Sequence, residues 1–390
     1  MNFLALTLAA ISLLIWVVLT FFRGAFWQLL AFDDDIAKQE SPEHWPRVVA
    51  IVPARNEAET IARTMESLVK QDYAGELGLV VVDDHSEDGT AALAEEAAER
   101  VGASERVLIL QSAALESGWT GKLLAMQQGV ETGIGRAAKY FWFTDADIEH
   151  APDTLRRVVQ RAESDKLDLV SLMALSQVNS LPERLLIPPF LYFFLKLYPP
   201  GWTASRERKT AGAAGGCILL RRTALERIGG LAAIRGEVID DCTLARAVKQ
   251  TGGGLWMGLT RKSVSLRTYT SFTEIKDLIA RTAFTQLGYS GWLLAGTLLG
   301  MLMTYLLPVI STFSGQPVVW RLGMAAWALM AITYLPTVRF YKMSPLWAAA
   351  LPAAAAFYTY ATWVSAVRYW LGRGGQWKGR TQAPVKSSAQ

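Results

Sequence analysis

The chain has 390 residues, of which 51% are hydrophobic and only 19% are charged. This balance is more apolar than that of an average soluble domain, which argues against a purely soluble protein. The net charge of +4 is too small to indicate nucleic-acid binding, but it fits an anionic membrane surface or a phosphate-bearing substrate. Two cysteines cannot build a disulfide framework, and three scattered histidines offer no zinc ligand set, so any metal must rest on oxygen ligands.

The chain opens with an apolar run over residues 3 to 22, which ends at Arg23. A membrane span needs about 20 apolar residues, so we expect a transmembrane anchor over residues 1–25. A cleaved signal peptide is the alternative. The run has no basic start and no small-residue cleavage site after it, which favours the anchor.

Between residues 46 and 275, short apolar runs alternate with helical periods, as expected of one α/β domain. Strands are expected at 47–53, 79–83, 107–110, 141–144 and 168–175, and helices at about 57–71, about 89–100 and from 121 onward. Alternating strands and helices predict an α/β fold with a mostly parallel sheet covered on both faces. Ligands of such sheets bind beyond the carboxyl ends of the strands.

Acidic residues follow three of these strands. The first strand ends in Pro-Ala-Arg-Asn-Glu (53–57), the second in Asp-Asp-His-Ser-Glu-Asp-Gly-Thr (83–90) and the fourth in Thr-Asp-Ala-Asp (144–147). We expect these three sets to converge on one crevice. Ser86 and Asp88 could instead only cap the helix that follows them.

The last of these sets contains Asp145 and Asp147, two residues apart. At a strand end this spacing places both side chains on one side. Two carboxylates held close repel each other unless a cation shares them, and Mg²⁺ or Mn²⁺ prefers such oxygen ligands. The pattern therefore predicts a metal site. The triplet alone is a weak signal. It is stronger here because it directly follows an apolar strand.

Two later segments are unusual in composition. Residues 211–217 are nearly all Ala and Gly and precede a strand, which permits close backbone approach to a ligand or forms a bare turn. Residues 185–202 are apolar and aromatic but interrupted by prolines. They are too broken for a span and are expected to lie in the membrane interface and admit a lipid acceptor, or else to pack as core.

Apolar runs return at about 292–312, 322–338 and 346–367. They predict C-terminal transmembrane helices, which tolerate the prolines within them; three buried soluble helices are the alternative. We expect residues 276–372 to hold an interfacial helix and these spans, and residues 373–390 to form a disordered basic tail.

The orientation in the membrane follows from basic loop residues. Arg339 and Lys342, between the second and third runs, place that loop and the middle domain in the cytoplasm. The basic tail after residue 367 then lies outside, against the same rule, so one run could be re-entrant or lie flat.

The motifs Val-Ala-Ile-Val-Pro-Ala-Arg-Asn-Glu, Val-Val-Asp-Asp-His-Ser-Glu-Asp-Gly-Thr and Asp-Ala-Asp, in this order, resemble those of the family 2 inverting glycosyltransferases. The resemblance covers roughly residues 46–275 and implies a GT-A type nucleotide-diphosphate-sugar transferase fold. With Gly-Trp-Thr-Gly-Lys at 118–122 and the flanking apolar runs, the chain looks most like the bacterial hopene-associated glycosyltransferases.

This resemblance implies a multi-pass enzyme of the bacterial inner membrane with a cytoplasmic catalytic domain. Such an enzyme moves a single sugar from a nucleotide-sugar donor, a UDP-sugar by our expectation, to a lipid acceptor such as a hopanoid. It uses Mg²⁺ or Mn²⁺ as cofactor.

The resemblance also assigns roles to single residues at the donor site. Glu57 and Asp84 match the acidic residues that contact the nucleotide base and ribose, and Pro53 and Ala54 match the backbone wall beside them. Lys122 matches a basic residue near the nucleotide, unless it is an ordinary solvated lysine.

The reacting groups are assigned in the same way. Asp145 and Asp147 match the metal and diphosphate site, and Asp240 and Asp241, at the start of a helix, match the acidic pair that supplies the catalytic base. Asp241 is the expected base, because an acceptor hydroxyl is a poor nucleophile and a carboxylate can take its proton during attack. Asp240 could instead be only the helix N-cap.

One departure from the family and two alternatives remain. Polymer-forming members carry Gln-x-x-Arg-Trp late in the domain, whereas residues 281–289 read Arg-Thr-Ala-Phe-Thr-Gln-Leu-Gly-Tyr. This argues against the first alternative, a polysaccharide synthase. The second, a noncatalytic membrane scaffold that keeps the fold, is separable by a donor-hydrolysis assay. Gly-Ile-Gly-Arg-Ala-Ala at 133–138 follows a helix and precedes a strand, the reverse of a dinucleotide fingerprint, so a dehydrogenase is discarded.

Overall fold

The computed structural model describes the chain apart from residues 1–2, 34–41, 374–375, 378–379 and 382–390. The contacts between residues divide the chain into two units. We call them the helical unit (Met1–Leu30, Val178–Gly201 and Thr268–Gln382) and the α/β unit (Ala31–Gln177, Trp202–Arg267 and Ala383–Gln390).

This division differs from the expected boundaries, because residues 178–201 and 268–275 of the segment 46–275 belong to the helical unit. The expected disordered tail, 373–390, lies largely outside the described residues. Within it, β9 (Gln376–Trp377) and β10 (Arg380–Thr381) form a short antiparallel pair.

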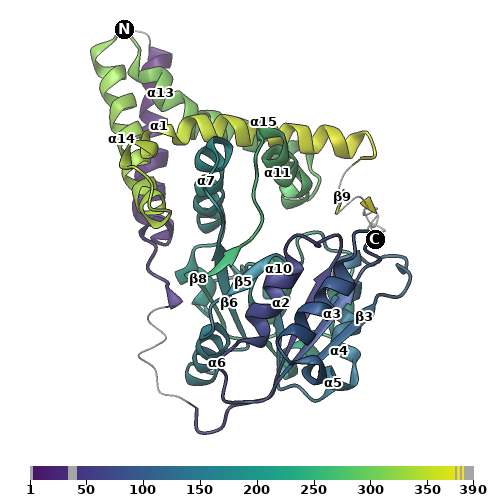
Figure 1. Cartoon of the computed structure of the whole chain (residues 1–390). Helices are drawn as coiled ribbons and strands as arrows, with labels where there is room; N and C mark the ends of the chain where they lie inside the picture. Colours follow the sequence, from purple (N-terminus) through teal and green to yellow (C-terminus); the bar gives the residue numbers. More distant parts are fainter. Residues whose placement is uncertain (1–2, 34–41, 374–375, 378–379, 382–390) are drawn as a thin grey trace. The chain divides into compact units, whose positions relative to one another are not determined.

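The α/β unit is built on an eight-stranded sheet with the order β3-β2-β1-β4-β7-β6-β8-β5 (Figure 1). The strands are β1 (Val48–Ala54), β2 (Leu77–Asp83), β3 (Val107–Gln111), β4 (Tyr140–Phe143), β5 (Ile148–His150), β6 (Leu169–Leu175), β7 (Ile218–Arg221) and β8 (Leu255–Ser265). Strands β1 to β4 pair in parallel, as do β6 and β8, whereas β7 and β5 run antiparallel to their neighbours. The expected mostly parallel sheet is confirmed.

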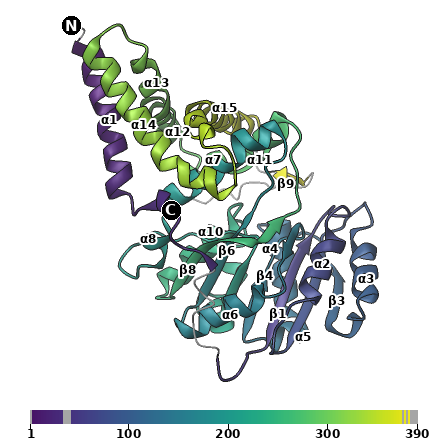
Figure 2. The same cartoon turned by 60° about the vertical axis from the view of Figure 1, so that its left-hand side comes forward.

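Both faces of the sheet are covered by helices (Figure 2). Alternate side chains of β1 show why: Val48 and Ala50 pack into one apolar cluster, and Val49 and Ile51 into the other. A strand buried on both faces is typical of a parallel sheet. One cluster contains α2 (Ile61–Val69), α3 (Thr90–Arg100) and α6 (Thr154–Ser164), and the other contains α4 (Gly121–Glu131), α9 (Arg222–Arg227) and α10 (Asp240–Gln250).

The register of the first strands determines where functional residues gather. Ala54 at the end of β1 is the partner of Asp83 at the end of β2, and Ile51 is the partner of Phe143 at the end of β4. The carboxyl ends of these strands therefore lie at one edge of the sheet. The three acidic sets that follow the strands all begin there.

The helical unit contains α1 (Phe3–Phe22), α7 (Leu181–Leu197), α11 (Phe272–Gln286), α12 (Gly291–Met301), α13 (Leu307–Thr312), α14 (Pro317–Phe340) and α15 (Leu351–Trp370). Within the described part of the chain, three helical stretches are long and apolar enough to cross a membrane: Phe3–Phe22, Gly291–Thr312 and Pro317–Phe340. They coincide with the expected anchor and the first two C-terminal runs. The third expected run forms α15, which is not among the three.

A π-helical turn, Leu302–Leu306, joins α12 to α13. Such a turn disturbs the regular helical hydrogen bonds, and in apolar surroundings the affected carbonyls need other donors. Helix α1 supplies two: the indole N–H of Trp16 donates to the Thr304 carbonyl at 2.6 Å, and the Ser12 hydroxyl donates to the Met303 carbonyl at 2.8 Å. These bonds attach the first helix to a segment far along the chain.

Candidate active site

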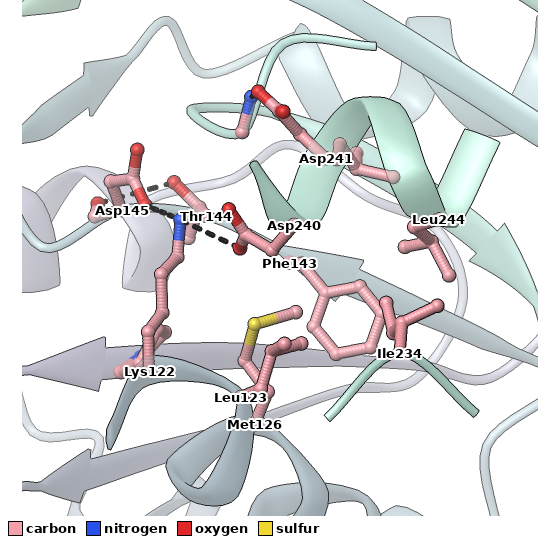
Figure 3. A pocket seen from close by; sticks show the side chains of 13 residues that line it. Lys122, Leu123, Met126, Phe143, Thr144, Asp145, Ile234, Asp240, Asp241 and Leu244 are labelled. Atoms are coloured by element: carbon pink, nitrogen blue, oxygen red, sulfur yellow. Dashed lines mark hydrogen bonds and ion pairs between the residues drawn. The ribbon is translucent and has the colours of Figure 1, made fainter. Parts of the chain in front are cut away.

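A pocket lies at the carboxyl end of β4, beside the first turns of α4 and α10 (Figure 3). Its polar side chains group together, whereas the apolar ones form the opposite part of the wall. The polar lining residues are Lys122, Thr144, Asp145, Asp240 and Asp241; the others are Pro53, Leu123, Met126, Phe143, Gly215, Ile218, Ile234 and Leu244.

Lys122 is central to this polar group. It stands in the first turn of α4, which Thr120 caps by accepting a hydrogen bond from the Leu123 N–H. Its Nζ lies 2.8 Å from Asp145 Oδ1 and 3.2 Å from Asp240 Oδ2. Burial alone would lower the pKa of Lys122, but the carboxylates of Asp145 and Asp240 outweigh it and raise that pKa. Lys122 is therefore a charged, ion-paired group and not an ordinary solvated lysine.

Asp240 and Asp241 occupy the first turn of α10, so neither is the N-cap, which is Ile239. Asp241 accepts hydrogen bonds from the backbone N–H of Gly215 at 3.0 Å and of Cys242 at 2.6 Å. Burial and the neighbouring carboxylate of Asp240 raise the pKa of Asp241 to about 6. A carboxyl group tuned this way can exchange a proton near neutral pH.

Gly215 shows how closely these groups converge. A Cβ at this position would lie 3.3 Å from Lys122 Nζ, 3.6 Å from Asp241 Oδ2 and 3.7 Å from Asp145 Oδ2. One ammonium and two carboxylates therefore face a single point on the backbone before β7. Gly215, from the small-residue stretch 211–217, is thus part of the pocket wall.

A buried histidine supports the segment that carries Asp145. His150 Nε2 lies 2.8 Å from the hydroxyl of Thr144, the residue before Asp145, and Nδ1 lies 2.8 Å from the Ser263 hydroxyl. Burial lowers the pKa of His150 to about 3, although nearby Asp145 acts in the opposite direction. The imidazole is neutral at physiological pH. Its role was not evident in the sequence, where the three histidines look unrelated.

A second ionic cluster lies along the same edge of the sheet. The Arg267 guanidinium contacts Asp147 Oδ2 at 2.9 Å through Nε and Glu57 Oε1 at 2.9 Å through Nη2. We call this the Arg267 cluster, and the group of Lys122, Asp145, Asp240 and Asp241 the Lys122 cluster. Arg267 was not predicted as a site residue. It follows the end of β8, and the acidic site residues after β1, β2 and β4 were predicted from the same kind of position.

The acidic set after β2 contacts the segment that follows β1. Asp84, buried at the end of β2, lies 3.6 Å from Arg55 Nη1, and its N–H donates to the Ala54 carbonyl at 2.7 Å. Asp88 accepts hydrogen bonds from the N–H groups of Ala58 and Thr90, so it stabilises the start of α3 as the capping alternative predicted. The three sets therefore meet at one edge of the sheet. Backbone N–H groups of Asn56 and Glu57 donate to the hydroxyls of Ser86 and Thr90, which joins the first two sets, and Arg267 joins Glu57 to Asp147.

The expectation that Asp145 and Asp147 lie on one side is wrong. Strand β4 ends at Phe143, and a turn at Ala146 and Asp147 replaces the extended backbone which that expectation required. As a result Asp145 pairs with Lys122 and Asp147 with Arg267.

A divalent metal fits only part of this arrangement. Among the described residues, no three Asp, Glu, His or Cys side chains are placed to hold a metal ion by themselves. Mg²⁺ and related ions at phosphate sites need only one or two protein carboxylates, because phosphate oxygens and water complete the shell. Asp145, with 36% of its side chain exposed in a cluster rich in carboxylates, fits this requirement.

Residues 49–229 match the family model described as Glycosyl transferase family 2. The matched part is a little less than half of the chain and is similar to glycosyl transferase family 2 domains. The match ends before Asp240, so the assignment of Asp240 and Asp241 depends on the geometry of the pocket.

Three curated relatives match parts of the chain. Probable glycosyltransferase YdaM of Bacillus subtilis (strain 168) is 35% identical over 101 residues, which are 24% of each chain. Succinoglycan biosynthesis protein ExoO of Rhizobium meliloti (strain 1021) is 34% identical over 33% of this chain and 35% of that protein. An uncharacterized protein of Methanocaldococcus jannaschii is 29% identical over 32% of this chain and 50% of that protein. The matches thus span half or less of each relative.

Among solved structures, the mannosyltransferase PcManGT from Pyrobaculum calidifontis, in complex with GDP-Man and Mn²⁺, is similar with a TM-score of 0.57 and 18% identity. The similarity covers 92% of this chain and 99% of that chain. It shows a common fold, and the expected GT-A type α/β architecture of a nucleotide-sugar transferase is confirmed.

Proposed function

We propose that the chain is a membrane-bound inverting glycosyltransferase that moves a single sugar from a nucleotide-diphosphate sugar to a lipid acceptor. The observation that carries this proposal is the Lys122 cluster. In it, Asp240 and Asp241 from α10 share a pocket with Lys122 and Asp145, at the carboxyl edge where α/β sheets bind ligands.

Asp241 is the proposed catalytic base. Two backbone N–H donors fix its carboxylate, and its raised pKa allows it to accept a proton from an acceptor hydroxyl. As the proton leaves, the hydroxyl oxygen attacks the anomeric carbon from the face opposite the diphosphate. The bond to the diphosphate breaks with its electron pair, and the configuration at the sugar inverts.

The donor is proposed to lie along the same edge. Pro53 and Ala54 would form the wall beside the nucleotide, with Glu57 and Asp84 for the base and ribose. Lys122 and Asp145 would contact the diphosphate. A divalent ion held there by Asp145 would offset the charge on the leaving diphosphate. Asp147 could join Asp145 as a ligand only after releasing Arg267.

The solved relative supports the class of donor and metal proposed, since PcManGT was determined with GDP-Man and Mn²⁺. The nucleotide and sugar of this chain remain to be identified by assay, and a UDP-sugar is the first candidate. The hopanoid acceptor is likewise proposed from the similarity of the motifs.

The helical unit supports the membrane part of the proposal. It contains twelve Lys and Arg but only three Asp and Glu, a net charge of +9 that favours contact with anionic lipid headgroups. Large apolar side chains are exposed on its helices: Trp292 at 90%, Ile310 at 61% and Leu299 at 60%. Such surfaces are typical of contact with lipid. We propose the bacterial inner membrane, with the α/β unit in the cytoplasm.

The test is a panel of nucleotide sugars with membrane lipids, with Mn²⁺ or with a chelator, on the wild type and Asp241→Asn. We expect the variant to bind donor like the wild type but to transfer about 10²–10⁴ times more slowly, the usual range for loss of a general base. Isotope-labelled sugar in the lipid fraction reports transfer, and donor protection of melting temperature reports binding.

Asp168→Asn is the matched control. Asp168 is a partly buried aspartate with an arginine partner, Arg227 at 2.8 Å, and it precedes β6 at the opposite edge of the sheet. It should transfer at the wild-type rate. Full transfer by Asp241→Asn would remove the proposed base, and a wild type that binds but never consumes any donor would favour a scaffold.

A further inference from the structure

We propose that Lys122 is a built-in counter-cation, which holds the carboxylates of Asp145, Asp240 and Asp241 together and competes with a divalent metal for them. This inference rests on the proposed function, in which a metal uses Asp145. It adds that the carboxylates of the pocket are already paired with a positive charge of the chain itself before metal and donor bind.

Distances place the ammonium between the acids. Lys122 Nζ lies 2.8 Å from Asp145 and 3.2 Å from Asp240, and the point above Gly215 is within 3.7 Å of Lys122, Asp241 and Asp145 together. Figure 3 shows Lys122 reaching up from α4 between Asp145 and Asp240. The ammonium therefore already occupies the side of Asp145 on which its acidic neighbours lie.

Charge explains why the ammonium is needed. Three carboxylates this close in one pocket repel one another, and a single lysine offsets part of that repulsion. A divalent ion would offset more, but it would also repel an ammonium a few ångströms away. Metal and Lys122 are thus alternatives at the same carboxylates. Free metal should bind weakly until the diphosphate supplies the missing oxygen ligands.

A simpler role for Lys122 predicts something different. If the lysine only contacts the donor phosphate, its removal weakens donor binding and leaves metal affinity unchanged. If it is a counter-cation, its removal creates an uncompensated acidic pocket that a metal can fill.

The experiment compares wild type, Lys122→Met and Lys122→Arg in detergent without donor. Bound Mn²⁺ is measured by electron paramagnetic resonance, and melting temperature is measured in chelator and in Mn²⁺. We expect Lys122→Met to bind Mn²⁺ at least tenfold more tightly than the wild type. We also expect it to melt lower in chelator and to recover by several degrees in Mn²⁺. Lys122→Arg keeps the charge and should behave like the wild type.

Lys139→Met is the matched control, because Lys139 also pairs with a carboxylate, Glu163 at 3.1 Å, but lies just before β4 at the other end of the strand. Its Mn²⁺ affinity should not change. Mn²⁺ binding by Lys122→Met that is no tighter than that of the wild type overturns the inference. Failure of this variant to fold in Mn²⁺ as well as in chelator also overturns it. Neither readout needs turnover, so a chain inactive on every donor would refute the proposed function and leave these titrations intact.

Discussion

The Lys122 cluster and the Arg267 cluster lie at the same edge of one sheet, yet they differ in the number of carboxylates that share one positive group. In the Arg267 cluster one planar guanidinium faces two carboxylates, and 35% of the arginine side chain is exposed. In the Lys122 cluster one ammonium, with 20% of its side chain exposed, faces three carboxylates, from the end of β4 and the first turn of α10.

In the Arg267 cluster the positive group is paired with every carboxylate. In the Lys122 cluster the carboxylates outnumber the positive group by more, so repulsion between them remains. The pKa values of Asp241 and Lys122 are raised by their surroundings in the pocket, and Arg267 is a fork-shaped partner that matches carboxylates well. Shifted groups in a pocket are the ones expected to do chemistry. The three experiments below test this contrast.

The largest effect should appear in the pH dependence of transfer. Asp241 must be ionised to accept a proton, and its pKa is raised to about 6, so protonation below that value removes the base. We expect the transfer rate to fall about tenfold for each pH unit below about 6, reaching about a hundredfold by pH 4. An unshifted aspartate, with a pKa of about 3.9, would keep its full rate to near pH 4.

Asp240→Asn sharpens this measurement, because Asp240 is the neighbouring charge that raises the pKa of Asp241. The midpoint of its profile of transfer rate against pH should move toward lower pH. The rate at the high-pH plateau shows any loss of activity that has another cause. Tryptophan fluorescence at each pH checks that the fold persists. A wild-type midpoint near pH 4, unmoved by this variant, would contradict the assignment of Asp241 as a shifted base.

Much of the fold was predictable because its signals are local. Residues 48–53 and 79–82 are unbroken apolar runs, and they lie in β1 and β2, which are buried over their whole length. Strands β5 and β8 escaped prediction. Strand β5 has three residues, two of them polar, and β8 contains Gly258, Arg261 and Lys262. Both depend on pairing with strands far away in the sequence, which a local pattern does not reveal.

The site was predictable residue by residue but not as an arrangement. Motif spacing brought Lys122, Asp145 and Asp241 into one hypothesis, and the three lie in one pocket. The separation of Asp147 from Asp145 depends on a turn and on Arg267, which comes from the end of β8. Partners that meet only through tertiary packing leave no trace in the spacing of a motif.

The second prediction concerns His150, beneath the Lys122 cluster. Its folded pKa is about 3, against an unfolded value of about 6.5, so between these values the unfolded chain binds the proton and the native chain does not. Stability from this residue is therefore full above pH 6.5 and is lost as pH falls. Between pH 7 and pH 5 the loss should be about 2 kcal/mol, or about 4–8 °C in melting temperature.

His150→Gln is the matched comparison, because its side chain is polar but does not titrate in this range. It should be less stable than the wild type at pH 7, but the difference between the two should shrink toward pH 5. An equal stability difference between the two proteins at both pH values would show that the imidazole is solvated, and the assignment of His150 as a buried neutral group would be wrong.

The smallest effect is expected at Arg267, whose replacement measures how much the Arg267 cluster contributes to stability. Arg267→Met removes the guanidinium between Glu57 and Asp147, and a partly exposed pair of this kind contributes about 1 kcal/mol, or about 2–4 °C in melting temperature. Salt should reduce the loss, because it screens the repulsion between the two carboxylates. Arg63→Met, which removes the more exposed contact with Glu149, should change little. If Arg267→Met instead melts as low as Lys122→Met does in chelator, both clusters carry comparable strain. The distinction between a satisfied and a strained group of charges would then fail.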